Sequence, residues 1–192
     1  MNFKIQPFGA VSNKFIALNC SDFQSACEFI AQLPYRRNLQ KDHVLCVFQD
    51  LGGTCSTKHA ILRKLAMEQN QLDVKLMLGI FKMDVIYSSK IQATLEKYQL
   101  VYIPEAHNYL KIGTDYFDFT TPNSNYESFQ SNILEEQEIE YNEITTEKVA
   151  IHKVFLESWL VAKKIDYSIC EIWQIREQCI ANLEENGLTK SN

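Results

Sequence analysis

Apolar residues at every second position set the strongest constraint on the fold of this chain. Val74, Leu76, Leu78 and Ile80 follow this period, and residues 102–112 follow it again. Side chains of a β-strand point alternately to the two faces of its sheet, so a period of two is typical of a strand with one buried face. We therefore expect a half-buried strand at 74–80 and a second strand further along the chain.

The strand at 102–112 is expected to form a hairpin. Gly113-Thr114 follows it, a further alternating segment covers residues 115–120, and Thr121-Pro122 closes the pair. Two residues that include glycine are a typical turn between antiparallel strands. With such a turn, residue 112 lies opposite 115 and residue 107 lies opposite 120.

Helical spacing of apolar residues precedes and interrupts these strands. A Ser21–Gln24 capping box opens a helix that Pro34 ends, and a second helix opens after Gly52-Gly53 and runs to about Gln69. A short helix is expected over residues 88–98, between the first strand and the hairpin.

The C-terminal third of the chain completes the pattern. Residues 123–145 are polar and acidic, which predicts a surface excursion with room for one edge strand. Two helices are expected after it, at about 146–163 and 168–185, the second opened by a Ser168–Glu171 capping box and followed by Gly187. The predicted class is α+β: helices, then an antiparallel sheet, then a helical pair.

Length limits the number of domains. The chain has 192 residues, of which 46% are hydrophobic, enough for one domain with its own core. We expect a single domain over 1–192, made of a core at about 20–122, the acidic excursion at 123–145 and the C-terminal helices at 146–187. The sequence leaves the oligomeric state open.

Charge and cysteine content exclude several classes of protein. A net charge of −5 without a basic block argues against nucleic-acid binding, and no stretch is apolar enough to span a bilayer. The first residues lack the apolar core of a secretory signal, so a cytoplasmic location is expected. The six cysteines contain no C-x-x-C pair and the four histidines are scattered, so we expect reduced thiols, no metal site and no other cofactor.

Cys55 is the first candidate for chemistry, because it lies where a glycine turn leads into a helix. Unpaired amides and the dipole at a helix start favour anions, so a thiol there is more acidic than an ordinary cysteine. Gly52 and Gly53 allow the backbone to approach a ligand closely and leave amides available to stabilise an oxyanion. A thiolate nucleophile also needs a base and a group that orients the base.

The hairpin register supplies both groups. Alternate residues along a strand share a face, and so do residues directly opposite each other. His107 and Asp118 are then diagonal neighbours on one face, whereas Asp115 points to the other, together with Asn108 and apolar residues of the expected core. A three-residue loop would reverse this choice between the two aspartates.

Three short segments of the chain, taken together, resemble the signature of a known enzyme superfamily. The chain has Gly53-Thr-Cys55, His107-Asn-Tyr109 and Asp118-Phe-Thr120, in the order Cys, His, Asp. This pattern resembles the transglutaminase-like superfamily of papain-like cysteine enzymes, whose signature reads glycine-x-Cys, His-x-Trp and Asp-Pro-Thr. Segments 33–38, 53–60 and 105–107 look most like an uncharacterised bacterial branch of it. Tyr109 for Trp and Phe119 for Pro are departures.

The resemblance covers about residues 20–122 and implies a papain-like core, in which a helix that carries the cysteine packs on an antiparallel sheet. It implies a Cys55–His107–Asp118 triad for cysteine-dependent acyl transfer or amide hydrolysis, of transglutaminase, peptidase or deamidase type. A thiolate attacks an amide or ester carbonyl, a thioester acyl-enzyme forms, and water or an amine receives the acyl group. The substrate would be a peptide, a protein or a small amide.

Several other residues are candidates for supporting roles. Gln49 has the spacing from Cys55 of the oxyanion-hole glutamine of papain-like proteases, and His59 lies one helical turn after Cys55. The candidates for oxyanion or supporting roles are Gln49, Thr54, His59 and Tyr109. The candidates for binding an acidic substrate group are Arg36 and Arg37, while Lys58 is expected in solvent.

Two other interpretations stay open. Gly-Gly-x-Cys with the same residue order is similar to arylamine N-acetyltransferases, which carry an acetyl group from coenzyme A. The chain can also be a non-catalytic binding module that kept the fold. Selective alkylation of Cys55 near pH 6 separates a reactive thiolate from such a module.

Overall fold

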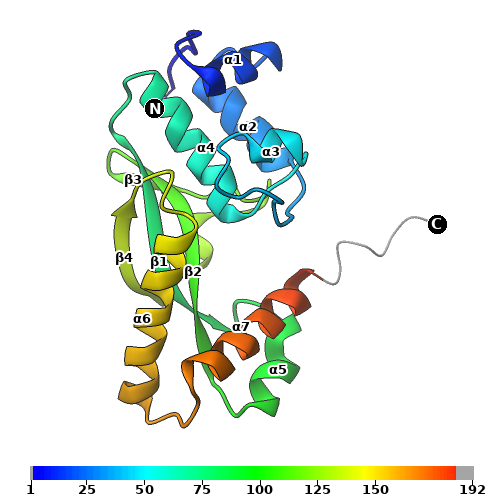
Figure 1. Cartoon of the computed structure of the whole chain (residues 1–192), viewed down its shortest axis with the longest axis vertical. Helices are drawn as coiled ribbons and strands as arrows, with labels where there is room; N and C mark the ends of the chain where they lie inside the picture. Colours follow the sequence, from blue (N-terminus) through cyan, green and yellow to red (C-terminus); the bar gives the residue numbers. More distant parts are fainter. Residues whose placement is uncertain (1, 185–192) are drawn as a thin grey trace, which may run out of the picture.

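The alternating segments form a four-stranded antiparallel sheet at the centre of the molecule (Figure 1). The computed structural model describes residues 2–184. The sheet has the order β3-β2-β1-β4. Its strands are β1 (Val74–Asp84), β2 (Tyr102–Ile112), β3 (Asp115–Phe117) and β4 (Ile133–Ile139). The predicted class, α+β with an antiparallel sheet, is confirmed.

The hairpin has the predicted two-residue turn. Ile112 lies opposite Asp115 and Leu110 lies opposite Phe117, which is the expected register. Gly113 has φ 61°, a left-handed conformation that glycine adopts without steric cost. Because β3 ends at Phe117, the chain leaves the sheet just before Asp118.

Strand β1 is buried on both faces, so the prediction of a half-buried strand was wrong. Leu76, Leu78 and Ile80 belong to one hydrophobic cluster, whereas Met77 and Phe81 belong to a second one. β1 lies between β2 and β4, and apolar side chains cover it on either side. The apolar residues at odd positions were the signal for this second buried face.

The helices before β1 gather at one end of the molecule (Figure 1). They are α1 (Ala10–Ala17), which was not predicted, α2 (Phe23–Gln32), α3 (Cys46–Gln49) and α4 (Cys55–Glu68). The N-cap of α2 is Asp22, which accepts a hydrogen bond from the Ser25 amide at 2.9 Å, so this cap lies one residue after the expected Ser21. Helix α4 packs against both β1 and β2.

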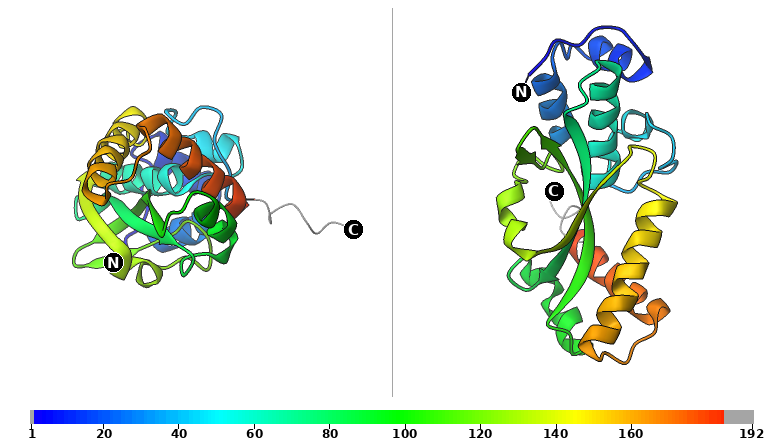
Figure 2. Two further views of the ribbon diagram at one scale, coloured as in Figure 1. Left: turned by 90° about the horizontal axis from the view of Figure 1, so that it is seen from below. Right: turned by 90° about the vertical axis from the view of Figure 1, so that its left-hand side faces the viewer.

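The remaining helices lie towards the other end of the sheet (Figures 1 and 2). They are α5 (Gln92–Lys97), preceded by the 3₁₀ turn Ser89–Ile91, α6 (Thr146–Lys163) and α7 (Ile169–Glu184). The predicted helical pair is confirmed, and its members pack on each other. The Ser168 amide donates to Glu171 at 2.8 Å, as the capping box predicts. The expected helix end at residue 185 and Gly187 lie outside the described residues.

The acidic segment at 123–145 contains one edge strand, as the sequence allowed. It folds as two 3₁₀ turns, Tyr126–Ser128 and Gln130–Asn132, followed by β4, which pairs with β1. Strands β1 and β2 run along the long axis of the molecule and connect its two helical ends (Figure 2). Within residues 2–184, no helix combines the length and the apolar character that crossing a bilayer requires.

Candidate active site

Cys55 is the first residue of α4, and a tight loop contact fixes this helix start. The Gly53 amide donates to the Pro34 carbonyl at 3.1 Å, and the Arg36 amide donates to the Gly53 carbonyl at 3.2 Å. A Cβ atom on Gly52 would lie 2.6 Å from the Arg36 side chain, so this approach requires glycine. Because the first amides of a helix lack acceptors within it, the Cys55 N–H is available to an oxyanion.

His107 and Asp118 make the predicted contact, although the strand pairing ends at Phe117 and Asp118 lies just beyond it, not within the expected strand 115–120. His107 Nε2 lies 2.9 Å from Asp118 Oδ2, and the Asp118 side chain is 5% exposed. The Thr120 amide donates to Asp118 Oδ1 at 2.9 Å, which holds the carboxylate after the chain leaves β3. Asp115, on the opposite face, is not part of this contact.

The other side of the His107 ring faces the cysteine. Cys55 and His107 lie close enough for each side chain to shift the pKa of the other. Since Asp118 occupies Nε2, the Nδ1 atom is the nitrogen available to the sulfur. Cys55 and His107 also line the same cavity, of about 580 Å³. The structure thus brings sulfur, imidazole and carboxylate into one row.

The electrostatics of this row favour the charged form of each group. Burial raises the pKa of Cys55, but Lys148 and His107 outweigh this effect and lower it to about 6. Burial lowers the pKa of His107, but Asp118 and the thiolate raise it to about 10. Burial raises the pKa of Asp118, but the positive charge of His107 outweighs this effect and lowers the pKa well below its usual range. These opposite shifts favour a thiolate–imidazolium pair, and such a thiolate is a nucleophile.

Lys148, on α6, is a site residue that the sequence did not reveal. Its Nζ lies 4.0 Å from Cys55 Sγ and donates to Ser56 Oγ at 2.9 Å and to Asn108 Oδ1 at 2.7 Å. The residue is 8% exposed. No local motif could have found it, because α6 reaches the start of α4 only through the tertiary fold.

Asn108 has a role beyond the core position that the hairpin register predicted. Its side chain is fully buried as expected, but it links Lys148 to the sheet, since its Nδ2 donates to the Met77 carbonyl at 2.9 Å. Its backbone N–H is also one of the groups that lower the pKa of Cys55. His107 therefore acts on the sulfur through its side chain, and Asn108 acts on it through its backbone and through Lys148.

His59 lies behind the row and connects two of its supports. Its Nδ1 is 2.7 Å from the Cys55 carbonyl oxygen, and its Nε2 accepts a hydrogen bond from the Phe119 amide at 2.8 Å. Burial lowers the pKa of His59 to about 4, so the ring is neutral at neutral pH. It holds the first turn of α4 against the loop that carries Asp118.

Lys58 was expected in solvent, and this expectation was wrong. The residue is fully buried, and its Nζ donates to the carbonyl oxygens of Leu33 and Thr120. The ammonium thereby fixes the end of the Asp118 loop next to α2. Two backbone acceptors explain how this charge is held away from water.

The remaining predicted residues lie around the row with differing involvement. Gln49 is exposed and lines neither of the two cavities that Cys55 lines, so the structure does not bring it to the sulfur. Thr54 lines one of them, and its buried Oγ1 has no hydrogen-bond partner among the described residues. Tyr109 is fully buried beside His107, with ring centroids 6.2 Å apart, and its hydroxyl donates to Glu136 on β4.

The two arginines lie on the loop before α3 and differ in position. Arg36 Nη1 donates to the Asp50 carbonyl at 2.8 Å, and Arg36 lines neither cavity of Cys55. Arg37 lines one of these cavities and forms an ion pair of 2.7 Å with Glu177 on α7. Only Arg37 is therefore placed near a ligand bound at the sulfur.

Cys55 lies between two cavities of different character. The larger one, of about 580 Å³, contains His107 and is bordered by apolar side chains such as Phe81 and Ile180. The smaller one, of about 340 Å³, contains Lys148 and further charged residues. Both cavities have Cys55 and Glu105 in their walls. A ligand with its reacting atom at the sulfur can extend into both.

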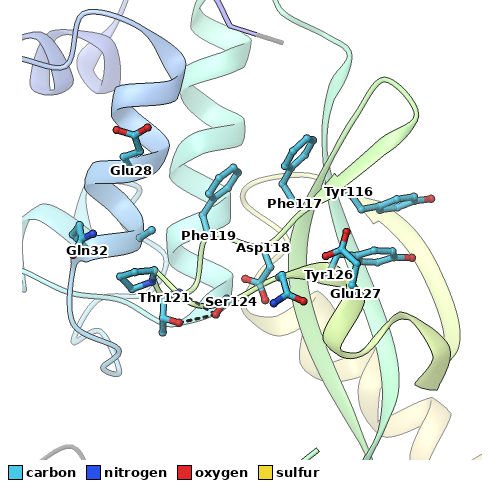
Figure 3. A pocket seen from close by; sticks show the side chains of 13 residues that line it. Glu28, Gln32, Tyr116, Phe117, Asp118, Phe119, Thr121, Ser124, Tyr126 and Glu127 are labelled. Atoms are coloured by element: carbon cyan, nitrogen blue, oxygen red, sulfur yellow. Dashed lines mark hydrogen bonds between the residues drawn. The ribbon is translucent and has the colours of Figure 1, made fainter.

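A third cavity, of about 370 Å³, lies beyond Asp118 (Figure 3). Glu28 and Gln32 of α2 border it on one side, with Tyr116 and Tyr126 on the other. Cys55 is not among its lining residues, so a ligand there has no access to the sulfur.

Comparisons of the chain with protein-family models, with curated proteins and with solved structures found no match. Within the part of the chain that the structure describes, no three His, Cys, Asp or Glu side chains are arranged to hold a metal ion.

Proposed function

We propose that this protein is a cysteine-dependent acyltransferase or amide hydrolase with Cys55 as nucleophile, His107 as acid and base, and Asp118 as the group that orients His107. The observation that carries the proposal is the 2.9 Å contact of His107 with Asp118, in a cavity whose wall Cys55 and His107 share. The place of Cys55 at the start of a helix packed on an antiparallel sheet supports the resemblance to papain-like and transglutaminase-like enzymes.

The first step is acylation of the cysteine. The Cys55 thiolate attacks the carbonyl carbon of an amide or ester, and the carbonyl electrons move to oxygen. The Cys55 amide and the Lys148 ammonium stabilise this oxyanion. The oxyanion then collapses, the bond to the leaving group breaks, and the proton of the His107 imidazolium goes to the departing nitrogen or oxygen. The product is a neutral thioester on Cys55.

The second step returns the sulfur to its starting state. Water or an amine attacks the thioester carbon while neutral His107 removes its proton. The carbon–sulfur bond breaks, the acyl group leaves as an acid or a new amide, and the thiolate–imidazolium pair is restored. Asp118 keeps the ring in one orientation through both steps, as a carboxylate does in related triads.

Acylation of Cys55 by p-nitrophenyl acetate tests this proposal. We expect a burst of p-nitrophenolate that approaches one equivalent per chain, an acetyl mass on the Cys55 peptide, and loss of both in Cys55→Ala. Cys170→Ala is the matched control, because Cys170 is an exposed cysteine outside both cavities and its removal should leave the burst intact.

The proposal fails if Cys55→Ala retains the burst while circular dichroism shows that both variants are folded. Adding an amine such as glycine amide to the acylated protein separates transfer from hydrolysis. An acyltransferase forms the acetylated amine, whereas a hydrolase releases only acetate.

A further inference from the structure

The smaller cavity beside Cys55 has an unusual charge content. Four Lys and Arg side chains line it, compared with two carboxylates. The basic residues are Arg37, Lys41, Lys148 and Arg176, and the acidic ones are Glu105 and Glu177. This excess of positive charge lies in a protein with a net charge of −5, so it is a local feature of the cavity.

The two carboxylates are already engaged by the arginines. Arg176 Nε donates to Glu105 at 2.6 Å, and both Arg176 and Arg37 contact Glu177. These ion pairs neutralise one another across α7, β2 and the loop before α3. Neither lysine of the cavity takes part in these ion pairs.

Lys41 and Lys148 form no ion pair with a carboxylate within residues 2–184. Lys148 hydrogen-bonds neutral oxygens of Ser56 and Asn108, and its charge faces the Cys55 sulfur. Burial and repulsion from Lys148 lower the pKa of Lys41 to about 8, so it is an ammonium at pH 6.5. Thr54 adds a buried hydroxyl without a partner in the described residues.

We propose that this cavity is an anion-binding subsite, and that the substrate of Cys55 carries a carboxylate or phosphate group that Lys41 and Lys148 bind. The inference rests on the proposed function, because it assigns the substrate's orientation at the same sulfur. The apolar part of the substrate lies in the larger cavity, next to Phe81 and Ile180.

The chemistry of acylation gives this subsite a further role. The thiolate is the negative charge nearest to Lys148, and it disappears, together with the positive charge of His107, when Cys55 becomes a neutral thioester. An anionic group in the cavity then gives Lys148 a nearby negative charge in the acyl-enzyme. Unpaired buried charges are costly, which favours substrates that bring their own anion.

Competing alkylation by iodoacetate and iodoacetamide at pH 6.5 measures the preference for an anion directly. The two reagents are similar in size, and with each of them the thiolate displaces iodide. Peptide mass spectrometry gives the rate constants at Cys55, from which we take the ratio of the iodoacetate to the iodoacetamide rate constant. Exposed Cys170 is the internal reference. We expect the ratio to be higher at Cys55 than at Cys170, and to fall about fivefold in Lys41→Gln because one nearby charge is removed.

Lys97→Gln is the matched control, since it removes the same charge from exposed α5 and should leave the ratio unchanged. Protection of Cys55 from iodoacetamide then identifies the anion. Succinate should protect Cys55 if the subsite takes a carboxylate, and inorganic phosphate should protect it if the subsite takes a phosphate. Neutral succinamide should not protect Cys55 in either case.

The outcomes separate the inference from the proposed function. An unchanged ratio in Lys41→Gln, or absence of protection by both anions, overturns the subsite even though Cys55 reacts rapidly with iodoacetamide. Slow alkylation of Cys55 by both reagents contradicts the thiolate itself, and with it the proposed function. A ratio that falls in Lys41→Gln and not in Lys97→Gln supports the subsite.

Discussion

At the scale of single residues, the acidity of Cys55 results from opposing effects. Burial disfavours the thiolate, while the charges of Lys148 and His107 favour it. Lys148 belongs to α6 and His107 to β2, so the sulfur depends on parts of the chain that are distant in sequence. Removing either charge should return the thiol towards the behaviour of an ordinary buried cysteine.

Lys148→Met is expected to raise the pKa of Cys55 by about one unit or more, because the thiolate loses the positive charge nearest to it. The measurement is the rate of iodoacetamide alkylation at Cys55 between pH 4 and pH 10. The wild-type midpoint should lie near 6, as the lowered pKa of the thiol implies. Lys153→Met, an exposed position on the same helix, should keep the wild-type midpoint. An unchanged midpoint in Lys148→Met would contradict the role of this ammonium.

The sequence predicted the site residues that depend on local patterns, and it did not predict those that depend on contacts between distant segments. Cys55 follows from a local glycine turn, and the His107–Asp118 contact follows from a two-residue turn that fixes the register. Lys148 could not be predicted, because the sequence of residues 146–163 does not indicate which part of the fold this helix packs against. Lys58 was placed in solvent because its two acceptors are carbonyl groups of distant loops.

At the scale of elements, Arg176 connects α7 to β2 next to the site. Its guanidinium contacts both carboxylate oxygens of Glu105, whose side chain is 10% exposed. Removing one member of a buried pair leaves the other charged and unpaired, which costs about 3–5 kcal/mol. The attachment of α7 therefore depends on a pair that is costly to break on one side only.

Arg176→Met should lower the free energy of unfolding by about 3 kcal/mol, measured by urea denaturation. The double variant Glu105→Gln/Arg176→Met should recover most of this loss, because no unpaired charge remains. Lys75→Met, which breaks the exposed Lys75–Glu138 pair, should cost only about 0.5 kcal/mol. A double variant as unstable as Arg176→Met alone would show that the loss comes from packing.

Element types were predicted more reliably than their surroundings. The helices at 146–163 and 168–185 and the hairpin follow from periodicity and capping residues, which act within a few positions. The burial of both faces of β1 was missed, since the residues that cover its second face come from the acidic segment and from helices late in the chain. Helix α1 has only one basic and no acidic residue to mark its ends and was not predicted.

At the scale of the whole molecule, two hydrophobic clusters share the same two strands. One cluster includes Leu78 of β1 together with residues of the N-terminal helices, and the other includes Phe81 of β1 together with Trp159 of α6. Strands β1 and β2 contribute to both clusters. If one cluster unfolds and these strands detach, the other cluster becomes exposed to water. The two ends of the molecule should unfold together.

Urea unfolding monitored in two ways tests this coupling. Tryptophan fluorescence reports on the cluster that contains Trp159, and labelling of buried Cys27 and Cys46 reports on the other. We expect coincident midpoints, and Leu78→Ala should lower both together by the equivalent of about 3 kcal/mol. Separate midpoints would contradict the single unit that the sequence predicts.

The dispersal of the site along the chain has a consequence for biosynthesis. Cys55, His107 and Lys148 come from an early helix, a central strand and a late helix, and the thiol owes its acidity to the latter two. During translation the cysteine emerges long before Lys148, so a ribosome-bound chain carries an ordinary, weakly nucleophilic thiol. We therefore expect the full acidity of the thiol to appear only when α6 docks, so a chain truncated before α6 should carry a less acidic cysteine.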